Sequence, residues 1–460
     1  MVAVDAEKQA VDSVRSEAES PKGPPGAYYF LSLEVENVRC FKDAQTLPLA
    51  DSQGRPKRWT VLLGDNGLGK TTLLQVLASF QSGRRGSPLR GEPISFPRLF
   101  EARLQSEVRF LRAEAKEMTC KAALCHGAKL AGNDRAGWGL KLEVTLPTGG
   151  YAFSGGFFGA EGGAFVCYGY GASRRMSARA LAESRTEDTC KTLFDEAEPL
   201  MNAEEWLLQA DYAALSSDSD PAKRQRDQIK DILTRVLPDV TELRIRAGEG
   251  SLKTPAVEAR TPFGWVPLRN LSSGYRSLIA WIVDLAARLF EAYPDSPNPL
   301  AEPAVVLVDQ IDLFLHPKWQ LKLINHLVGL FPNAQFIASA HSPLIVQAAE
   351  DTNIVVLRRE GDHVVIDRDP GRVRGWRVDQ VLTSDLFGLS TTRDERTEAL
   401  LKERRSLLSK SALTPSEDER LKELDEQVAA LPFVESPQDV EAMELIRKAA
   451  EKLRHTAEVK

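Results

Sequence analysis

The sequence contains no apolar run of the roughly 20 residues that a membrane-crossing helix needs. Residues 1–27 lack the apolar core of a secretory signal, so we expect no such leader there. The five cysteines form no paired CxxC pattern, which favours a reducing cytoplasm over a disulfide framework. Cys120, Cys125 and His126 stand close together but lack further metal-binding partners, and we expect ordinary thiols there.

The sequence also lacks an excess of positive charge, since it has 59 Lys and Arg residues against 65 Asp and Glu residues. The formal net charge is -6, so the chain as a whole is not expected to attract nucleic acid, although a local basic groove stays open. The 460 residues are 43% hydrophobic and 27% charged, which is ordinary for a soluble globular protein of one to three domains.

One glycine-rich stretch follows a short apolar run, Trp59–Leu63, and precedes an apolar helical pattern, Leu73–Ala78. Its spacing fits G-x-x-x-x-G-K-[ST], the phosphate-binding loop, and its glycines let successive main-chain N–H groups face one centre. Lys70 is expected to reach the β- and γ-phosphates of a nucleotide, and the Thr71 hydroxyl to bind Mg²⁺. The predicted ATP-binding residues of this stretch are Asn66, Gly67, Gly69, Lys70, Thr71 and Thr72.

The remaining pattern predicts an α/β fold. A continuous apolar run at 304–308, a helix at 319–330 and a strand at 335–339 form a βαβ unit, and strands at 353–358 and 363–367 follow. Residues 1–27 are expected to be a disordered tail, and residues 28–390 one head with an insert at about 82–260. Residues 391–460 are charged and helical, with a capping box at Thr414–Glu417.

Three further motifs support a nucleotide-binding site that includes this glycine-rich loop. Val305–Val308 is an apolar strand that ends in Asp309, as in a Walker B motif, and Asp309 is expected to bind Mg²⁺ with Thr71. A small-residue segment at 271–275 opens a helix and suits a second phosphate contact. The strand at 335–339 ends in a polar tip that carries His341.

This order of motifs resembles the ATP-binding-cassette (ABC) ATPase head, and segments 37–42 and 311–317 resemble its soluble SMC-like and RecF-like branch. The resemblance covers roughly residues 28–368 and implies an ABC-type P-loop ATPase head with a mixed α/β insert and a C-terminal helical extension. It also implies a homodimer in which two heads sandwich two ATP molecules with Mg²⁺. The residues that it assigns are a trans signature of Ser272, Ser273 and Gly274, a γ-phosphate sensor at His341, and a nucleotide contact at Arg39.

Plainer interpretations stay open for several of these residues. Ser273 and His341 are also typical of helix caps, and Arg39 of a surface charge. His316 fits either an interface or a structural turn. Arg174 and Arg175 follow a glycine turn, where they fit a γ-phosphate contact, a nucleic-acid contact or a solvated loop.

The chain departs from the family at Gln310, where the family has the glutamate that positions or activates the attacking water. A glutamine amide cannot accept the proton, so the resemblance implies that Asp309, Gln310 and His341 form a catalytic group that turns over little. One hypothesis is that Gln310 is an engineered substitution of a natural glutamate; the alternative is a naturally inactive switch.

Segments 169–175, 202–208 and 382–389 further resemble bacterial anti-phage ATPases of the Septu type, which are also found beside retrons. That resemblance implies a regulatory ATPase with a separate HNH-type nuclease subunit as its partner, and nucleic acid is a further candidate partner. The alternatives are a RecF-like DNA-repair ATPase and a non-hydrolysing, ATP-dependent scaffold. No sustained heptads support a coiled-coil arm, and a transporter domain explains neither the insert nor the C-terminal helices.

Overall fold

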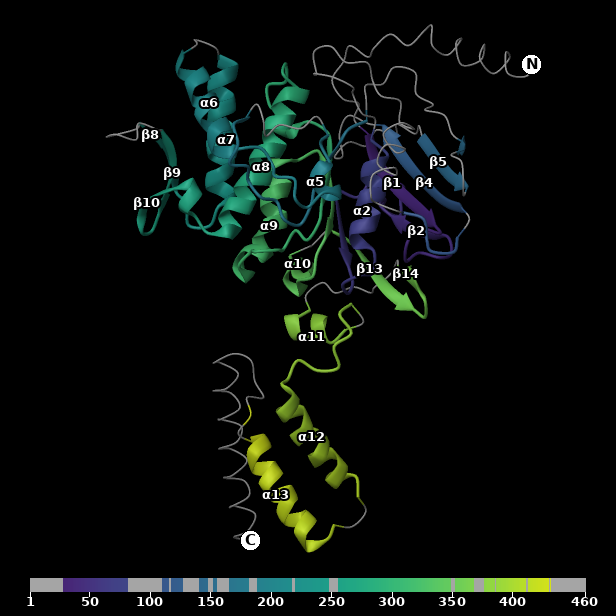
Figure 1. Cartoon of the computed structure of the whole chain (residues 1–460). Helices are drawn as coiled ribbons and strands as arrows, with labels where there is room; N and C mark the ends of the chain where they lie inside the picture. Colours follow the sequence, from purple (N-terminus) through teal and green to yellow (C-terminus); the bar gives the residue numbers. More distant parts are fainter. Residues whose placement is uncertain are drawn as a thin grey trace, which may run out of the picture. The chain divides into compact units, whose positions relative to one another are not determined.

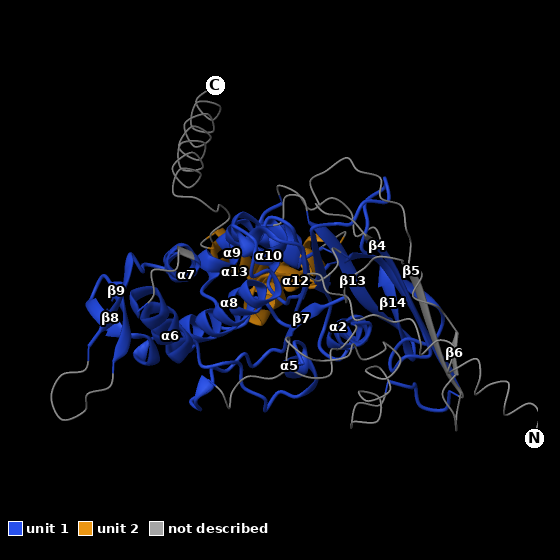
Figure 2. Ribbon diagram, turned by 90° about the horizontal axis from the view of Figure 1, so that it is seen from above, with its two compact units in different colours: residues 1–388 blue, residues 389–460 orange. Residues whose placement is uncertain are grey.

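The computed structural model describes most of the chain (Figure 1), namely residues 28–81, 110–115, 117–126, 140–147, 152–154, 165–181, 188–216, 220–247, 255–348, 352–367, 376–384, 386–410, 413–429 and 431. The predicted tail at residues 1–27 lies outside these residues, as does the last part of the predicted extension. The chain divides into two compact units, residues 1–388 and 389–460 (Figure 2).

The central element of the first unit is a six-stranded sheet in the order β14-β13-β3-β12-β11-β7. Its neighbours β13, β3, β12, β11 and β7 pair in parallel, and β14 pairs antiparallel with β13 at one edge. The strands are β3 (Trp59–Leu63), β7 (Cys167–Tyr170), β11 (Ala304–Val308), β12 (Ala334–Ser339), β13 (Asn353–Glu360) and β14 (His363–Asp367). Every residue of β3, β11 and β12 is buried, as expected for strands covered on both faces.

Each face of this sheet packs into its own hydrophobic cluster. In β3, Val61 points toward α8 and α9, while Leu62 points toward α2 and the strand β1. Alternation along β11 and β12 divides their side chains in the same way. The helices of the first unit are α2 (Lys70–Ser79), α5 (Lys191–Phe194), α6 (Ala203–Ser216), α7 (Asp220–Val236), α8 (Ser273–Ala292), α9 (Pro317–Leu330), α10 (Pro343–Gln347) and α11 (Val378–Leu382).

A second, antiparallel sheet in the order β2-β1-β4-β5-β6 lies beside α2 (Figure 1). The buried Gln335 side chain joins the two sheets, because it accepts a hydrogen bond from the Phe30 N–H at 2.8 Å and donates one to the Phe30 carbonyl at 2.8 Å. The strands are β1 (Tyr28–Glu36), β2 (Gln45–Pro48), β4 (Glu117–His126), β5 (Leu140–Pro147) and β6 (Ala152–Ser154).

The segment 82–260, expected to be an insert, contributes to the head itself. It supplies β4, β5 and β6 to the sheet of β1, and β7 to the central sheet. It also supplies two strands of a third sheet, ordered β10-β9-β8, whose members are β8 (Glu242–Arg246), β9 (Ala256–Thr261) and β10 (Gly264–Pro267). Helix α6 starts after Asn202, whose side-chain oxygen accepts a hydrogen bond from the Glu205 N–H at 3.2 Å.

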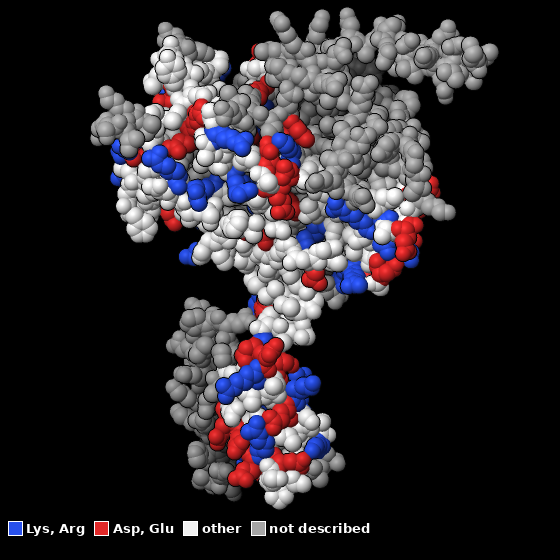
Figure 3. All heavy atoms as spheres, in the orientation of Figure 1, with Lys and Arg blue, Asp and Glu red and all other residues white. Residues whose placement is uncertain are grey.

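The described part of the second unit contains the helices α12 (Glu395–Leu408) and α13 (Pro415–Ala429), which pack against each other. The predicted capping box is confirmed, since the Thr414 N–H donates to the Glu417 carboxylate and the Glu417 N–H donates to the Thr414 hydroxyl at 3.4 Å, at the start of α13. Figure 3 shows Lys and Arg interspersed with Asp and Glu over this unit, and Arg404–Asp425 is one such ion pair between the helices. Among the described helices of both units, none has the length and apolar character to span a membrane.

Candidate functional site

The loop between β3 and α2 has the geometry that its glycines predict. Gly64, Gly67 and Gly69 all have positive φ, which L side chains rarely adopt. At Gly69 the space is also closed, because a Cβ atom would lie 2.5 Å from the Cys40 sulfur. The loop therefore requires glycine here, and it packs on the turn that follows β1.

Lys70 folds back over this loop. Its Nζ donates hydrogen bonds to the carbonyl oxygens of Gly64 at 2.6 Å and Asp65 at 2.8 Å. Burial lowers the pKa of Lys70, while the nearby carboxylates, Asp309 first among them, act in the opposite direction. Asn66 and Gly67, at the tip of the loop, are exposed.

The predicted pair of Thr71 and Asp309 lies together. The Thr71 hydroxyl donates a 2.7 Å hydrogen bond to Oδ2 of Asp309, which is buried at the end of β11. Oδ1 of Asp309 accepts a hydrogen bond from the Ser339 hydroxyl, at the end of β12. One hydroxyl and one carboxylate at the N-terminus of a helix are oxygen ligands of the kind that Mg²⁺ prefers. The described part of the chain contains no larger cluster of metal-binding side chains.

Gln310 follows Asp309 in a left-handed conformation, with φ 48°. Its N–H donates a 2.7 Å hydrogen bond to the Ser339 hydroxyl, so Ser339 contacts both residues of the turn. The sequence reasoning did not single out Ser339. The signal that identifies it is its place as the last residue of a strand parallel to β11, since parallel strands end at one edge.

His341 lies two residues beyond the end of β12. Its N–H donates a 3.0 Å hydrogen bond to Oδ2 of the buried Asp312. Burial lowers the pKa of the His341 imidazole, and the Lys70 charge lowers it further, so the neutral ring is favoured at pH 7. His316, by contrast, caps α9, where its Nδ1 accepts a hydrogen bond from the Lys318 N–H at 3.3 Å.

Arg39 lies beside the first turn of α2. Its Nη1 donates a 3.1 Å hydrogen bond to the Thr72 hydroxyl, and its guanidinium stands over the Phe110 ring at 5.3 Å from the centroid. The two adjacent arginines of the glycine turn differ, since Arg174 is buried beneath the turn at Gln310 and Arg175 is exposed.

The predicted signature residues lie at the start of α8, in another part of the structure from the glycine-rich loop. Ser272 is the residue before α8, and the side chains of Ser272 and Ser273 are exposed. Gly274 is buried against the turn after β11, where its absent Cβ would stand 2.5 Å from the Phe314 oxygen. In the described part of the chain, none of the hydrogen bonds given for these three residues reaches the glycine-rich loop.

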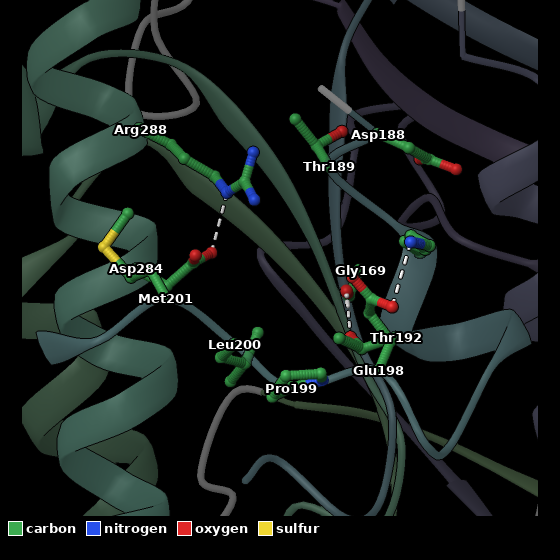
Figure 4. Close-up of a pocket in the computed structure, with 11 residues that line it drawn as sticks. Gly169, Asp188, Thr189, Thr192, Glu198, Pro199, Leu200, Met201, Asp284 and Arg288 are labelled. Atoms are coloured by element: carbon green, nitrogen blue, oxygen red, sulfur yellow. Dashed lines mark hydrogen bonds and ion pairs between the residues drawn. The ribbon is translucent and has the colours of Figure 1, made fainter. Parts of the chain in front are cut away.

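A small pocket lies between β7, the segment 188–201 and α8 (Figure 4). On the α8 side, the buried Asp284 carboxylate accepts hydrogen bonds from the Tyr170 hydroxyl at 3.0 Å and from Arg288 at 2.7 Å. None of the predicted nucleotide-binding or signature residues lines it. The hydrogen bond from Tyr170 to Asp284 beside this pocket joins β7 to α8.

Comparisons with known proteins found one family model, several curated relatives and several solved structures that are similar to this chain. Residues 170–347 match the family model described as AAA domain, putative AbiEii toxin, Type IV TA system. That range contains the predicted signature, Asp309, Gln310 and His341, but not the glycine-rich loop.

Two curated proteins are similar in sequence to this chain. The Septu protein PtuA of Bacillus mycoides is 25% identical over 398 residues, which are 85% of this chain and 48% of that protein. The Retron Vc95 probable ATPase of Vibrio cholerae is 35% identical over 136 residues, which are 29% of this chain and 25% of that protein. The chain thus spans about half the length of the first of these relatives, and less of the second. Among solved structures, the SMC head domain from Thermotoga maritima has a TM-score of 0.39 at 13% identity, covering 74% of this chain and 98% of that one.

Proposed function

We propose that this chain binds ATP with Mg²⁺ and works as an ABC-type ATPase in bacterial anti-phage defence, as a regulator of a separate nuclease. The observation that carries the proposal is the hydrogen bond from Thr71 to Asp309, which joins the glycine-rich loop to a strand end 238 positions away. The similarity to Septu and retron ATPases supports the same direction. The proposal assigns the chain to the cytoplasm.

In this proposal, the main-chain N–H groups from Asn66 to Thr72 and the N-terminus of α2 hold the phosphates. Lys70 leaves its two carbonyl partners and donates to the β- and γ-phosphate oxygens instead. Thr71 and Asp309 hold Mg²⁺, which neutralises charge that develops on the phosphates. The neutral His341 imidazole, just beyond the end of β12, contacts the γ-phosphate and senses its presence.

Binding is tested by the affinity of the whole chain for a fluorescent ATP analogue, with Mg²⁺ and with EDTA. Lys70→Ala is expected to weaken binding at least about tenfold, since it removes charge-assisted hydrogen bonds to phosphate. Lys318→Ala, which truncates an exposed lysine at the start of α9, is the matched control and should leave the affinity unchanged. Equal binding by both variants would contradict the proposal.

Turnover is proposed to be low because the Gln310 amide cannot take a proton from the attacking water. The ATPase rate of this chain is compared with that of Gln310→Glu. A rate that rises in Gln310→Glu supports an otherwise complete active site. Equal, negligible rates in the two proteins would rule out the engineered trap and favour the non-hydrolysing scaffold.

Two chains are proposed to close over two ATP molecules. The support is that one chain holds Ser273 and Gly274 away from its own loop, with both serine side chains of the signature exposed. In the Gln310→Glu background, Lys70→Ala and Ser273→Glu are each expected to lose activity. Mixing the two variants should restore part of it, because a mixed dimer keeps one intact site. No restoration at any ratio would exclude the shared site.

The proposed partner is an HNH-type nuclease subunit, held through the extension at 391–460. Deletion of residues 391–460 is expected to abolish copurification of the nuclease while the ATP affinity stays within about twofold. A truncated chain that still copurifies with the nuclease would make the extension a brace rather than a docking site. Salt-sensitive DNA binding without a protein partner would instead favour the DNA-repair alternative.

A further inference from the structure

Arg174 occupies an unusual position for an arginine, because its side chain is only 2% exposed. It follows β7 in a left-handed conformation, with φ 35°. Its guanidinium donates hydrogen bonds to the carbonyl oxygens of Gly171, Asp309 and Gln310, the last from Nη2 at 2.8 Å. All three acceptors lie just beyond the ends of two paired parallel strands, β7 and β11.

Main-chain oxygens accept the hydrogen bonds that the Arg174 guanidinium donates. Burial lowers the pKa of this guanidinium to about 10, and the Asp309 and Asp312 charges oppose that change. It therefore stays cationic at neutral pH. A buried cation is costly unless several hydrogen bonds compensate it, so three carbonyl acceptors at the ends of β7 and β11 indicate a specific task.

That task concerns the main chain at Gln310. Its φ of 48° is disfavoured for any residue other than glycine, so surrounding contacts must hold it. The Ser339 hydroxyl accepts from the Gln310 N–H on one side, and Arg174 donates to the Gln310 carbonyl on the other. Residue 310 is thus fixed at both of its main-chain polar groups, and its side-chain direction follows from that conformation.

The segment that carries Arg174 is itself anchored. The Tyr170 hydroxyl donates to Asp284 of α8, and the Gly171 N–H donates to the Thr192 hydroxyl at 3.2 Å. Gly171 also leaves no room for a side chain, since a Cβ atom would lie 2.1 Å from the main-chain carbonyl oxygen of Thr192. Because its own segment is held in place, Arg174 can hold the turn at Asp309 and Gln310 in one position.

We propose that Arg174 is a positioning residue, which holds the turn after β11 so that the side chain at 310 points toward the terminal phosphate and its attacking water. The inference rests on the proposed ATPase function and adds a role for a residue outside the nucleotide-binding motifs. Arg175, exposed and next in the chain, has no part in it.

The kinetic test uses the full chain with Gln310→Glu as the parent. Arg174→Gln is expected to lower kcat about 10- to 100-fold, because small displacements of a reacting group cost about that much, while the ATP affinity stays within about threefold. Arg174→Lys keeps the charge but lacks the rigid planar fork of donors that a guanidinium provides, so its kcat should lie between those of the parent and Arg174→Gln. Arg175→Gln is the matched control and should behave as the parent. Equal kcat values for Arg174→Gln and Arg175→Gln would overturn the proposal, as would a loss confined to ATP affinity.

A second measurement does not depend on nucleotide. Amide hydrogen exchange is followed in the peptide covering residues 306–314 of the unliganded protein, for Arg174→Gln, Arg174→Lys and Arg175→Gln. Exchange should rise in this peptide for Arg174→Gln and not for Arg175→Gln. If the parent neither binds nor hydrolyses ATP, the proposed function fails, yet this exchange still decides whether Arg174 holds the turn. Unchanged exchange in folded Arg174→Gln would overturn the inference; if Arg174→Gln does not fold, Arg174→Lys takes its place.

Discussion

Gly274 lies against the main-chain oxygen of Phe314, so closely that a Cβ atom at position 274 would stand 2.5 Å from it. Phe314 has a left-handed φ of 65°, and its side chain is 56% exposed. The contact joins the first turn of α8 to the turn that follows Asp309. The predicted signature is therefore in direct contact with the turn that follows β11 in the same chain.

Gly274→Ala is expected to destabilise the protein by about 1–3 kcal/mol, because the new methyl group must displace main chain. It should also weaken ATP-dependent dimerisation, measured by sedimentation. The control is Gly329→Ala in α9, where no atom lies within 4 Å of the added Cβ, and helix propensity should raise stability by up to about 1 kcal/mol. Unchanged thermal midpoint and dimerisation in Gly274→Ala would contradict the argument.

Thr71→Val is expected to weaken Mg²⁺-dependent ATP binding about tenfold or more, since it removes a hydroxyl that bonds to a charged carboxylate and keeps the shape. Thr71→Ser retains the hydroxyl and should bind nearly as the parent does. The affinities are compared at several Mg²⁺ concentrations. If Thr71→Val responds to Mg²⁺ as Thr71→Ser does, Thr71 is not a ligand of the metal.

His341 should make the folded state sensitive to mild acid. Because its pKa is lowered in the folded chain, the unfolded state binds a proton first as the pH falls through about 6.5, and stability falls with it. The thermal midpoint should therefore drop less between pH 7.5 and 5.5 in His341→Gln than in the parent. Identical slopes would mean that the imidazole titrates alike in both states.

Gln335→Leu tests the junction between the two large sheets. The change leaves a buried N–H and a buried carbonyl of Phe30 without their partner, and each is expected to cost about 1–3 kcal/mol. Gln228→Leu is the control: this half-buried α7 side chain donates one long hydrogen bond, 3.4 Å, to Asn298, and its loss should stay within about 0.5 kcal/mol. Urea unfolding followed by fluorescence compares the two, and equal midpoints would remove Gln335 from the account of stability.

Local patterns predicted the elements that build the candidate site. The strand before the glycine-rich loop is found at Trp59–Leu63, and the apolar run at Ala304–Val308 is a buried parallel strand, both as predicted. A run of apolar residues and a glycine turn are properties of neighbouring positions, so the sequence displays them directly. The roles assigned to Lys70, Asp309 and His341 stay predictions.

What the sequence did not display was the order of strands. Nothing local marks Cys167–Tyr170 as the neighbour of β11, because pairing between distant strands depends on the whole sheet. For that reason the two arginines at 174 and 175 looked alike in sequence, whereas one is buried beneath Gln310 and the other is exposed. Ser339 was overlooked for the same cause.

The pairing of β3 with β12 and β13 also governs when the head can form during synthesis. Strand β3 leaves the ribosome long before its partner strands are synthesised. Phe30 likewise lacks its hydrogen-bond partner Gln335 until 305 further residues have been added. Until then, an apolar strand and the loop after it have no sheet to join, and closing so large a loop is slow. The nascent chain should accordingly depend on chaperones until its last central strands emerge, and fragments that end before residue 334 should aggregate rather than fold.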